Sequence, residues 1–263
     1  MLGGFTGFKT SSGGDLGEQM LNKVASQSIR HLFSESDSVD VSVKCSPSSK
    51  LLQGSIDSFK MNGRGLLIRK QFWVETMQFE TDAVSIDFSS MLGGKIRLKQ
   101  PTQAVVQVTL TETGINEAFQ AELVSQKLHQ VTEPELMALS GGEPVSFSDV
   151  ELRLQPDNQI QIFAKAYLPN GMVPISLTST LAVERRRRIA FQTPKFEPDL
   201  VPEAARGTSE VVTLAFAKLL DNMVDLDRFD LDGVMMRINR LETAGDKLVF
   251  SGYAQIERFP AVG

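Results

Sequence analysis

Two stretches between residues 160 and 183 alternate between apolar and polar side chains. In the first stretch, the residues that share the apolar face are Ile160, Ile162, Ala164, Ala166 and Leu168. In the second stretch they are Ile175, Leu177, Leu181 and Val183, with serines and threonines between several of them. A period of two is that of a β-strand, so both stretches are predicted strands. Because each has one apolar and one polar face, we expect antiparallel strands over a single core.

The rest of the chain adds further strands and four helices. Alternation predicts strands at 39–45, 65–69, 73–79, 84–88, 95–98, 104–110, 233–241 and 247–258, with turns at Asn62-Gly63 and Gly93-Gly94. Apolar residues spaced by three and four predict helices at 15–33, 111–128 and 208–224. A short helix should follow Thr132 as its N-cap, with Glu135 completing the cap, and end at Gly141-Gly142. The strands and helices do not alternate singly, so the predicted fold class is α+β.

The composition describes the interior and excludes one class of partner. The chain of 263 residues has 16 Phe and 10 Met but only 2 Tyr and 1 Trp. Phe and Met bring bulk without a strong polar group, so they suit dry interiors and adaptable apolar surfaces. The 27 basic and 32 acidic residues leave a net charge of −5, which argues against a nucleic-acid partner.

The sequence has no recognisable catalytic or metal-binding motif. Cys45 is the single cysteine, and His31 and His129 are the only histidines, so a disulfide or a zinc site is not expected. Dinucleotide, phosphate-loop, nucleophile-elbow and metalloprotease motifs are all absent from the sequence. The acidic cluster Asp221, Asp225, Asp227, Asp230 and Asp232 lacks the ligand spacing of a calcium loop. We therefore expect a protein that is not an enzyme and holds no cofactor or metal.

Two features allow both a structural and a functional interpretation. The predicted helix at 208–224 has an apolar stripe, which fits either a packed core or the wall of a ligand tunnel. The run Arg185–Arg188 follows a predicted strand, and continued alternation would bury unpaired guanidinium groups, so the strand should end, bulge or reach a rim there. The four arginines either protect a sheet edge or contact an anionic surface such as lipid headgroups.

The two ends of the chain and the hydropathy of the sequence bear on localisation. Residues 1–14 are rich in Gly and Ser and are expected to form a flexible segment, and residues 260–263 are expected to be a tail. The N-terminus lacks the pattern of a secretory signal, and no stretch approaches the roughly 20 apolar residues that span a bilayer. These observations predict a cytoplasmic protein.

Several short motifs resemble one family. They are VDVSV at 39–43, LLQGSIDSF at 51–59, GRGL at 63–66, PTQA at 101–104, TETGIN at 111–116 and FDLDG at 229–233. With these motifs the chain resembles the LmeA-like phospholipid-binding family over residues 15–259, which we take as a single domain. Lacking a signal or anchor, it resembles the soluble, cyanobacterial-type members more than the exported actinobacterial ones. The resemblance implies a strongly curved antiparallel sheet wrapped around long amphipathic helices, as in tubular lipid-binding proteins.

The resemblance also implies a partner, a phospholipid or other acyl lipid, and transient contact with a membrane surface. The residues expected to line an apolar cleft for acyl chains are Phe119, Phe216, Leu219, Leu220, Met223, Met236 and Phe250. The residues expected to contact headgroups or the membrane are Arg185, Arg186, Arg187, Arg188, Phe5 and Phe8. Lipid transfer would extend this function. The alternative is a protein-interaction or assembly module with a fully packed core and no ligand, and the sequence leaves the oligomeric state open.

Overall fold

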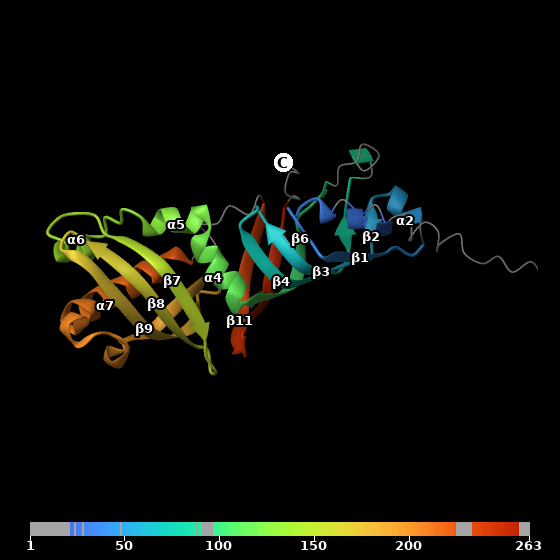
Figure 1. Cartoon of the computed structure of the whole chain (residues 1–263). Helices are drawn as coiled ribbons and strands as arrows, with labels where there is room; N and C mark the ends of the chain where they lie inside the picture. The colour runs from blue at the N-terminus through green and yellow to red at the C-terminus, as the bar shows by residue number, and fades with distance from the viewer. Residues whose placement is uncertain are drawn as a thin grey trace, which may run out of the picture.

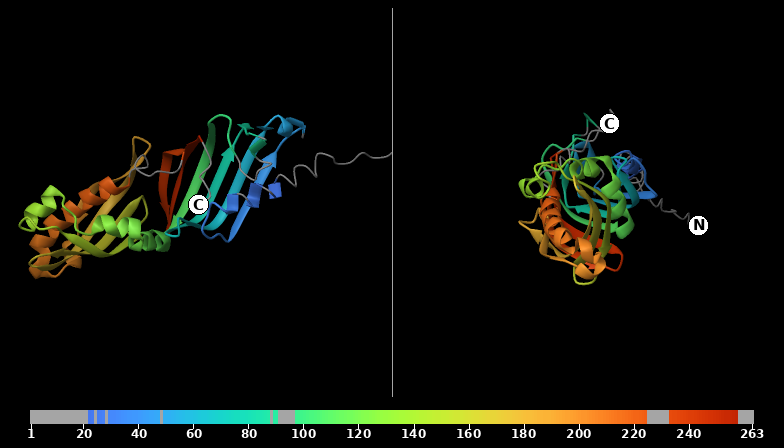
Figure 2. Two further views of the ribbon diagram at one scale, coloured as in Figure 1. Left: turned by 90° about the horizontal axis from the view of Figure 1, so that it is seen from above. Right: turned by 60° about the vertical axis from the view of Figure 1, so that its left-hand side comes forward.

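The computed structural model describes residues 22–23, 25–27, 29–47, 49–87, 89–90, 97–224 and 233–257. Within these residues the chain forms two large antiparallel sheets, which lie end to end in an elongated molecule (Figures 1 and 2). Helices pack mainly around the four-stranded sheet, and the six-stranded sheet forms the other end. The predicted α+β class with antiparallel sheets is confirmed.

The six-stranded sheet combines strands from both ends of the chain. Its order is β1 (Ser38–Lys44), β3 (Ser58–Ile68), β4 (Phe72–Thr81), β6 (Thr102–Thr111), β12 (Lys247–Ile256) and β11 (Val234–Ala244). The C-terminal hairpin β11–β12 therefore completes a sheet that the N-terminal strands begin, and Phe250 pairs with Val108. Next to it lie the short helix α2 (Ser49–Leu52) and a small sheet of β2 (Ser55–Ile56) and β5 (Val84–Ser85).

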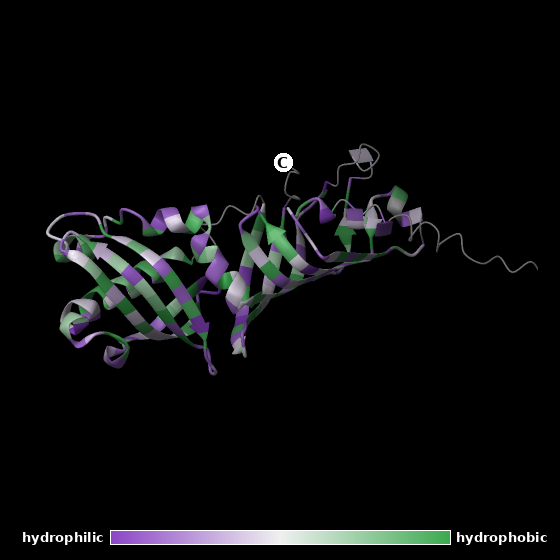
Figure 3. Ribbon diagram, viewed as in Figure 1, coloured by the Kyte–Doolittle hydropathy of each residue, from purple (hydrophilic) through white to green (hydrophobic). Residues whose placement is uncertain are grey.

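The four-stranded sheet contains the two stretches with the clearest alternation. Its order is β10 (Arg188–Phe196), β9 (Gly171–Glu184), β8 (Gln159–Leu168) and β7 (Ser146–Leu154). Ile160, Ile162 and Ala166 of β8 are completely buried, as the period of two predicts, and the alternating hydropathy is visible along the strands in Figure 3. Ser176 differs from the prediction, because it lies on the expected polar face and is also fully buried.

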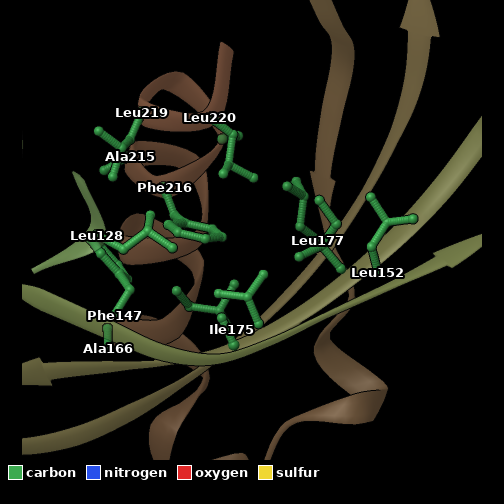
Figure 4. Packing of buried hydrophobic residues seen from close by; sticks show 14 of the residues in the cluster. Leu128, Phe147, Leu152, Ala166, Ile175, Leu177, Ala215, Phe216, Leu219 and Leu220 are labelled. Carbon is green, nitrogen blue, oxygen red and sulfur yellow. The ribbon is translucent and has the colours of Figure 1, made fainter. Parts of the chain in front are cut away.

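Helix α7 (Arg206–Met223) packs on the inner face of this sheet (Figure 4). The predicted apolar stripe lies on the core-facing side of α7, where Val212, Ala215, Phe216, Leu219 and Leu220 are buried and Met223 at the end is partly buried. Two 3-10 turns, η1 (Pro198–Leu200) and η2 (Glu203–Ala205), lead into the helix.

The connection between the sheets contains three short helices where two were predicted. They are α4 (Glu112–Gln120), α5 (Glu122–Leu128) and α6 (Pro134–Leu139). The predicted helix 111–128 is interrupted at Ala121, whose backbone is extended. The N-cap of α6 is Glu133 and not Thr132. Pro134 explains this start, because a proline forces the preceding residue out of the helical region while fitting the first helical position itself.

The predicted turn at Asn62-Gly63 is wrong. Both residues lie inside β3, and the chain reverses instead at Arg69 and Lys70, which have positive φ angles. A Cβ atom at Gly63 would lie 2.7 Å from the Leu66 side chain, so this glycine provides packing space within the strand.

Other predicted strands and helices are shorter in the structure, or lie outside the described residues. The strand predicted at 84–88 is only two residues long, and Leu98 of the strand predicted at 95–98 forms an isolated bridge with Ile86. Of the helix predicted at 15–33, the described residues between 22 and 30 are helical, and the chain turns at 31–32. Segments 1–14 and 260–263, the turn Gly93-Gly94 and the motif at 229–232 lie outside the described residues.

Candidate functional site

Buried apolar residues form three clusters along the length of the molecule. The helical core lies between α7 and the four-stranded sheet, and the rings of Phe147 and Phe216 pack within it at a tilt of 37°, with their centres 4.6 Å apart (Figure 4). The central core covers the inner face of the six-stranded sheet and consists of Leu66, Val74, Ala104, Val106, Val108, Ala254 and Ile256. The N-terminal core contains Ala25 and Ile29 of the first helical segment and residues of β1 and β3.

Partly buried residues join these clusters into one apolar interior. Leu110 of β6 and Phe250 of β12 pack against both the helical core and the central core. Met77 and Phe79 of β4 likewise pack against both the central core and the N-terminal core. The apolar interior therefore continues from the four-stranded sheet across the boundary and along the six-stranded sheet.

Six of the seven predicted lining residues converge on the helical core. Phe216 is fully buried, Leu219 and Leu220 are nearly so, and all three belong to α7. Phe119, Met223 and Phe250 are partly buried and pack against the same cluster. The seventh, Met236, is partly buried against the central core and pairs with Ala254. The residues with partial exposure are therefore those at the border of the interior.

The four arginines do not form one surface of equivalent cations. As predicted, the strand ends before them, because β9 stops at Glu184 and Arg185 and Arg186 form a tight turn with positive φ angles. Arg188 begins β10 and forms ion pairs with Glu184 at 2.6 Å and Asp221 at 3.2 Å. Arg186 donates a hydrogen bond to the Asn239 side chain (2.5 Å) and lies over the Tyr253 ring.

Other predicted features are structural or lie outside the described residues. Asp221 accepts a hydrogen bond from Phe191 N–H and pairs with Arg188, so it joins α7 to β10. The remaining four aspartates of the acidic cluster lie outside the described residues, as do Phe5 and Phe8. Among the described residues, no group of His, Cys, Asp and Glu side chains could hold a metal ion. In the same part of the chain, every helix is too short or too polar to cross a bilayer.

The motif at 111–116 attaches α4 to both sheets. Thr111 caps the helix by accepting a hydrogen bond from Gly114 N–H at 3.0 Å. The Glu112 carboxylate accepts from Leu154 N–H of β7 at 2.8 Å. The Asn116 side chain accepts from Leu152 N–H at 2.7 Å and donates to the Leu152 carbonyl at 2.9 Å, as a neighbouring strand would. Sequence reasoning found this motif as a family resemblance but missed its role at the boundary of the sheets.

The groups with shifted pKa values lie on the surface, away from the apolar interior. The Lys50 ammonium and the Ser46 N–H hold the pKa of the Asp57 carboxyl below its usual value. The Lys165 ammonium similarly lowers the pKa of Asp149, which in turn raises the pKa of Lys165. Exposed ion pairs explain these shifts, so they point to local tethering and not to acid–base chemistry.

One comparison with known proteins gives a match. The family model described as LmeA-like phospholipid-binding matches residues 13–252, which is nearly the whole chain. No curated protein and no solved structure matches the chain.

Proposed function

The chain belongs to the LmeA-like phospholipid-binding family, and from this we propose a specific mode of lipid binding. The protein holds the acyl chains of a phospholipid along its apolar interior, without chemistry of its own. It contacts membranes transiently and can carry the lipid between them.

The observation that carries this proposal is the continuity of the interior across the boundary between the two sheets. A diacyl lipid needs an apolar path longer than a single small core, and Phe250 and Leu110 join two cores into one path. Each buried methylene contributes about 0.8 kcal/mol, so even half of one acyl chain would bind with substantial affinity.

The seven lining residues then have two roles. Phe119, Met223, Met236 and Phe250 lie at the border of the interior, where they are partly buried and can contact acyl chains directly. Behind them lie the more deeply buried residues of the lining, Phe216, Leu219 and Leu220. Met side chains adapt to irregular apolar partners, which suits a lipid whose chains vary in length.

In this proposal the lipid headgroup and the membrane surface contact the cationic turn between β9 and β10. Arg185, Arg186 and Arg187 lie in the β9–β10 turn, and Arg188 at its base is held by two carboxylates and acts as a support. Phe5 and Phe8, which lie outside the described residues, would insert into the bilayer interface. In this proposal the sheets curve around the helices and the lipid, which would give the molecule a tubular shape.

Native mass spectrometry of the purified chain tests the proposal. We expect a phospholipid to remain bound, and organic extraction followed by lipid mass spectrometry should identify it. A lipid-free protein that also fails to take up phospholipid from detergent would contradict the proposal and support the alternative, a packed interaction module.

Two neighbouring methionines provide a matched pair of variants. Met236 faces the interior, whereas Met235 is exposed on the opposite face of β11. Met236→Gln places an amide in the apolar path at a cost of about 1–3 kcal/mol and should lower lipid occupancy at least about fivefold. When the purified variants are loaded from detergent, which needs no contact with a membrane, Met235→Gln should leave lipid occupancy unchanged. Equal lipid loss in both variants would show that the interior is not the binding site.

A further inference from the structure

The outer face of the six-stranded sheet carries a contiguous group of exposed apolar side chains. Val105 of β6, Tyr253 of β12 and Met235 of β11 are 55%, 47% and 44% exposed. Val105 pairs directly with Tyr253, and Tyr253 pairs with Arg237, which lies two residues from Met235 on the same face of β11. We call Val105, Tyr253 and Met235, with Arg186 and Arg237, the outer patch.

Arg186 places positive charge at the border of the outer patch. The Arg186 guanidinium lies 6.0 Å from the centre of the Tyr253 ring and bonds to Asn239, and both of these partners are neutral. Arg237 donates to the Met236 carbonyl (2.8 Å) and to the Met235 sulfur (3.5 Å). Among the described carboxylates near the patch, Glu80 pairs with Lys60 and Glu242 pairs with Arg240.

We propose that the outer patch docks on the surface of an anionic phospholipid bilayer. Tyrosine and arginine beside aliphatic side chains fit the polar–apolar boundary of a membrane, where each arginine adds to the attraction of anionic headgroups. The chain has a net charge of −5, so adhesion to an anionic surface requires a local positive region of this kind. The proposal rests on the proposed function, and it names the face through which the protein reaches its lipid source.

A second exposed pair shows why charge decides between candidate faces. Tyr167 and Met172 are cross-strand partners on β8 and β9 and are 46% and 52% exposed. Their neighbour Lys165 is paired with Asp149 at 2.8 Å. This pair matches the outer patch in apolar exposure, but its neighbouring lysine is neutralised by a carboxylate, whereas Arg186 contacts the neutral Tyr253 ring and Asn239, so the pair should not dock.

The strands of the outer patch also line the interior. Met235 and Tyr253 point outward from β11 and β12, whereas their chain neighbours Met236 and Ala254 pack against the central core. Docking through the outer patch therefore brings the two strands that border the apolar path next to the bilayer.

Vesicle flotation with the full chain tests this proposal. The probe is a vesicle of phosphatidylcholine with about 30% phosphatidylglycerol, compared with pure phosphatidylcholine, at low salt. The wild type should float with the anionic vesicles only, and the double variant Arg186→Gln/Tyr253→Ser should float at least about fivefold less. The matched control Lys165→Gln/Tyr167→Ser should float like the wild type, and thermal unfolding should show that both variants are folded.

Three results would overturn the docking proposal. They are a wild type that binds neither vesicle or both equally, a double variant that floats like the wild type, and a control variant that loses as much flotation. Native mass spectrometry of the same samples keeps this test separate from the proposed function. If lipid stays bound inside while the outer patch has no effect, only the docking face is wrong.

Discussion

Asn158 and Thr243 bond to each other twice across the boundary between the two sheets. Asn158 N–H donates to the Thr243 hydroxyl at 3.0 Å, and Thr243 N–H donates to the Asn158 side-chain oxygen at 2.8 Å. Asn158 lies in the turn between β7 and β8 with a φ of 59°, a conformation that asparagine tolerates better than most residues. The Asn158 amide also donates to the Leu241 carbonyl, and the Thr243 hydroxyl donates to Gln155. The turn of one sheet is thereby fastened to β11 of the other.

Removing this fastening should destabilise the whole molecule. Asn158→Gly keeps the left-handed backbone but loses the side-chain bonds, and Thr243→Val loses the hydroxyl bonds. Each variant should lower the free energy of unfolding by about 1–3 kcal/mol in urea denaturation. The double variant should lose less than the sum, by at least about 0.5 kcal/mol, because the residues share bonds. Strict additivity would mean that the two residues act independently.

Asn116 should matter for a similar reason on the other side of the boundary. Asn116→Ala removes both bonds to Leu152 and leaves the backbone groups of β7 without these partners. We expect a loss of about 1–3 kcal/mol in the free energy of unfolding. Thr113→Ala, an exposed position on the same helix, should change stability by less than about 0.5 kcal/mol. Comparable losses in the two variants would argue against the role of Asn116.

The single tryptophan offers a fluorescence test of where acyl chains lie. Trp73 is partly exposed and Phe250 joins two cores, so Trp73→Phe/Phe250→Trp moves the fluorophore to the interior. Phospholipid with brominated acyl chains, added at one equivalent, should quench this variant strongly. The wild type, with Trp73 alone, should be quenched much less. Stronger quenching of the wild type would place the chains outside the proposed path.

The pKa of Asp57 should be low because of its partners. Its carboxylate accepts hydrogen bonds from Lys50 and from Ser46 N–H, both at 2.7 Å. A carboxyl whose pKa is lowered by folding stabilises the fold above its ordinary pKa of 3.8, and this stabilisation is lost as the pH falls through the lower folded value. A carbon-13 NMR titration of the Asp57 carboxyl should therefore give a midpoint below 3.8. Lys50→Met should raise the midpoint, and an unchanged midpoint would exclude Lys50 as the cause.

The sequence predicted strands and buried helix faces well, because a single side of each element is covered. The apolar residues repeat every second position in β8 and form a stripe on α7, because these are the positions that face the core. Turns were predicted less well, since their chemistry competes with packing. Asn62-Gly63 has the composition of a turn, yet Gly63 lies in β3, where the absence of a Cβ atom leaves room for the Leu66 side chain.

The boundary between the sheets could not be predicted from local patterns. Asn158 and Thr243 are separated by 85 residues, and their contact depends on a left-handed backbone at Asn158. The outer patch could not be predicted for the same reason. Val105, Arg186 and Tyr253 belong to three distant segments of the chain, which only the folded sheet brings together. The burial of Phe216, Leu219 and Leu220 could be predicted from the sequence, since stripe residues of one helix share a face.

Photo-cross-linking with a phospholipid can show whether the acyl chains lie in the apolar interior. The full chain is loaded with phosphatidylglycerol that carries a diazirine at the end of one acyl chain, irradiated and digested, and the adducts are located by mass spectrometry. We expect adducts on interior residues of α7, β11 and β12, above all Met223, Met236 and Phe250. Adducts confined to outward-facing residues such as Met235 and Tyr253, or no adducts at all, would show that the acyl chains do not occupy the interior.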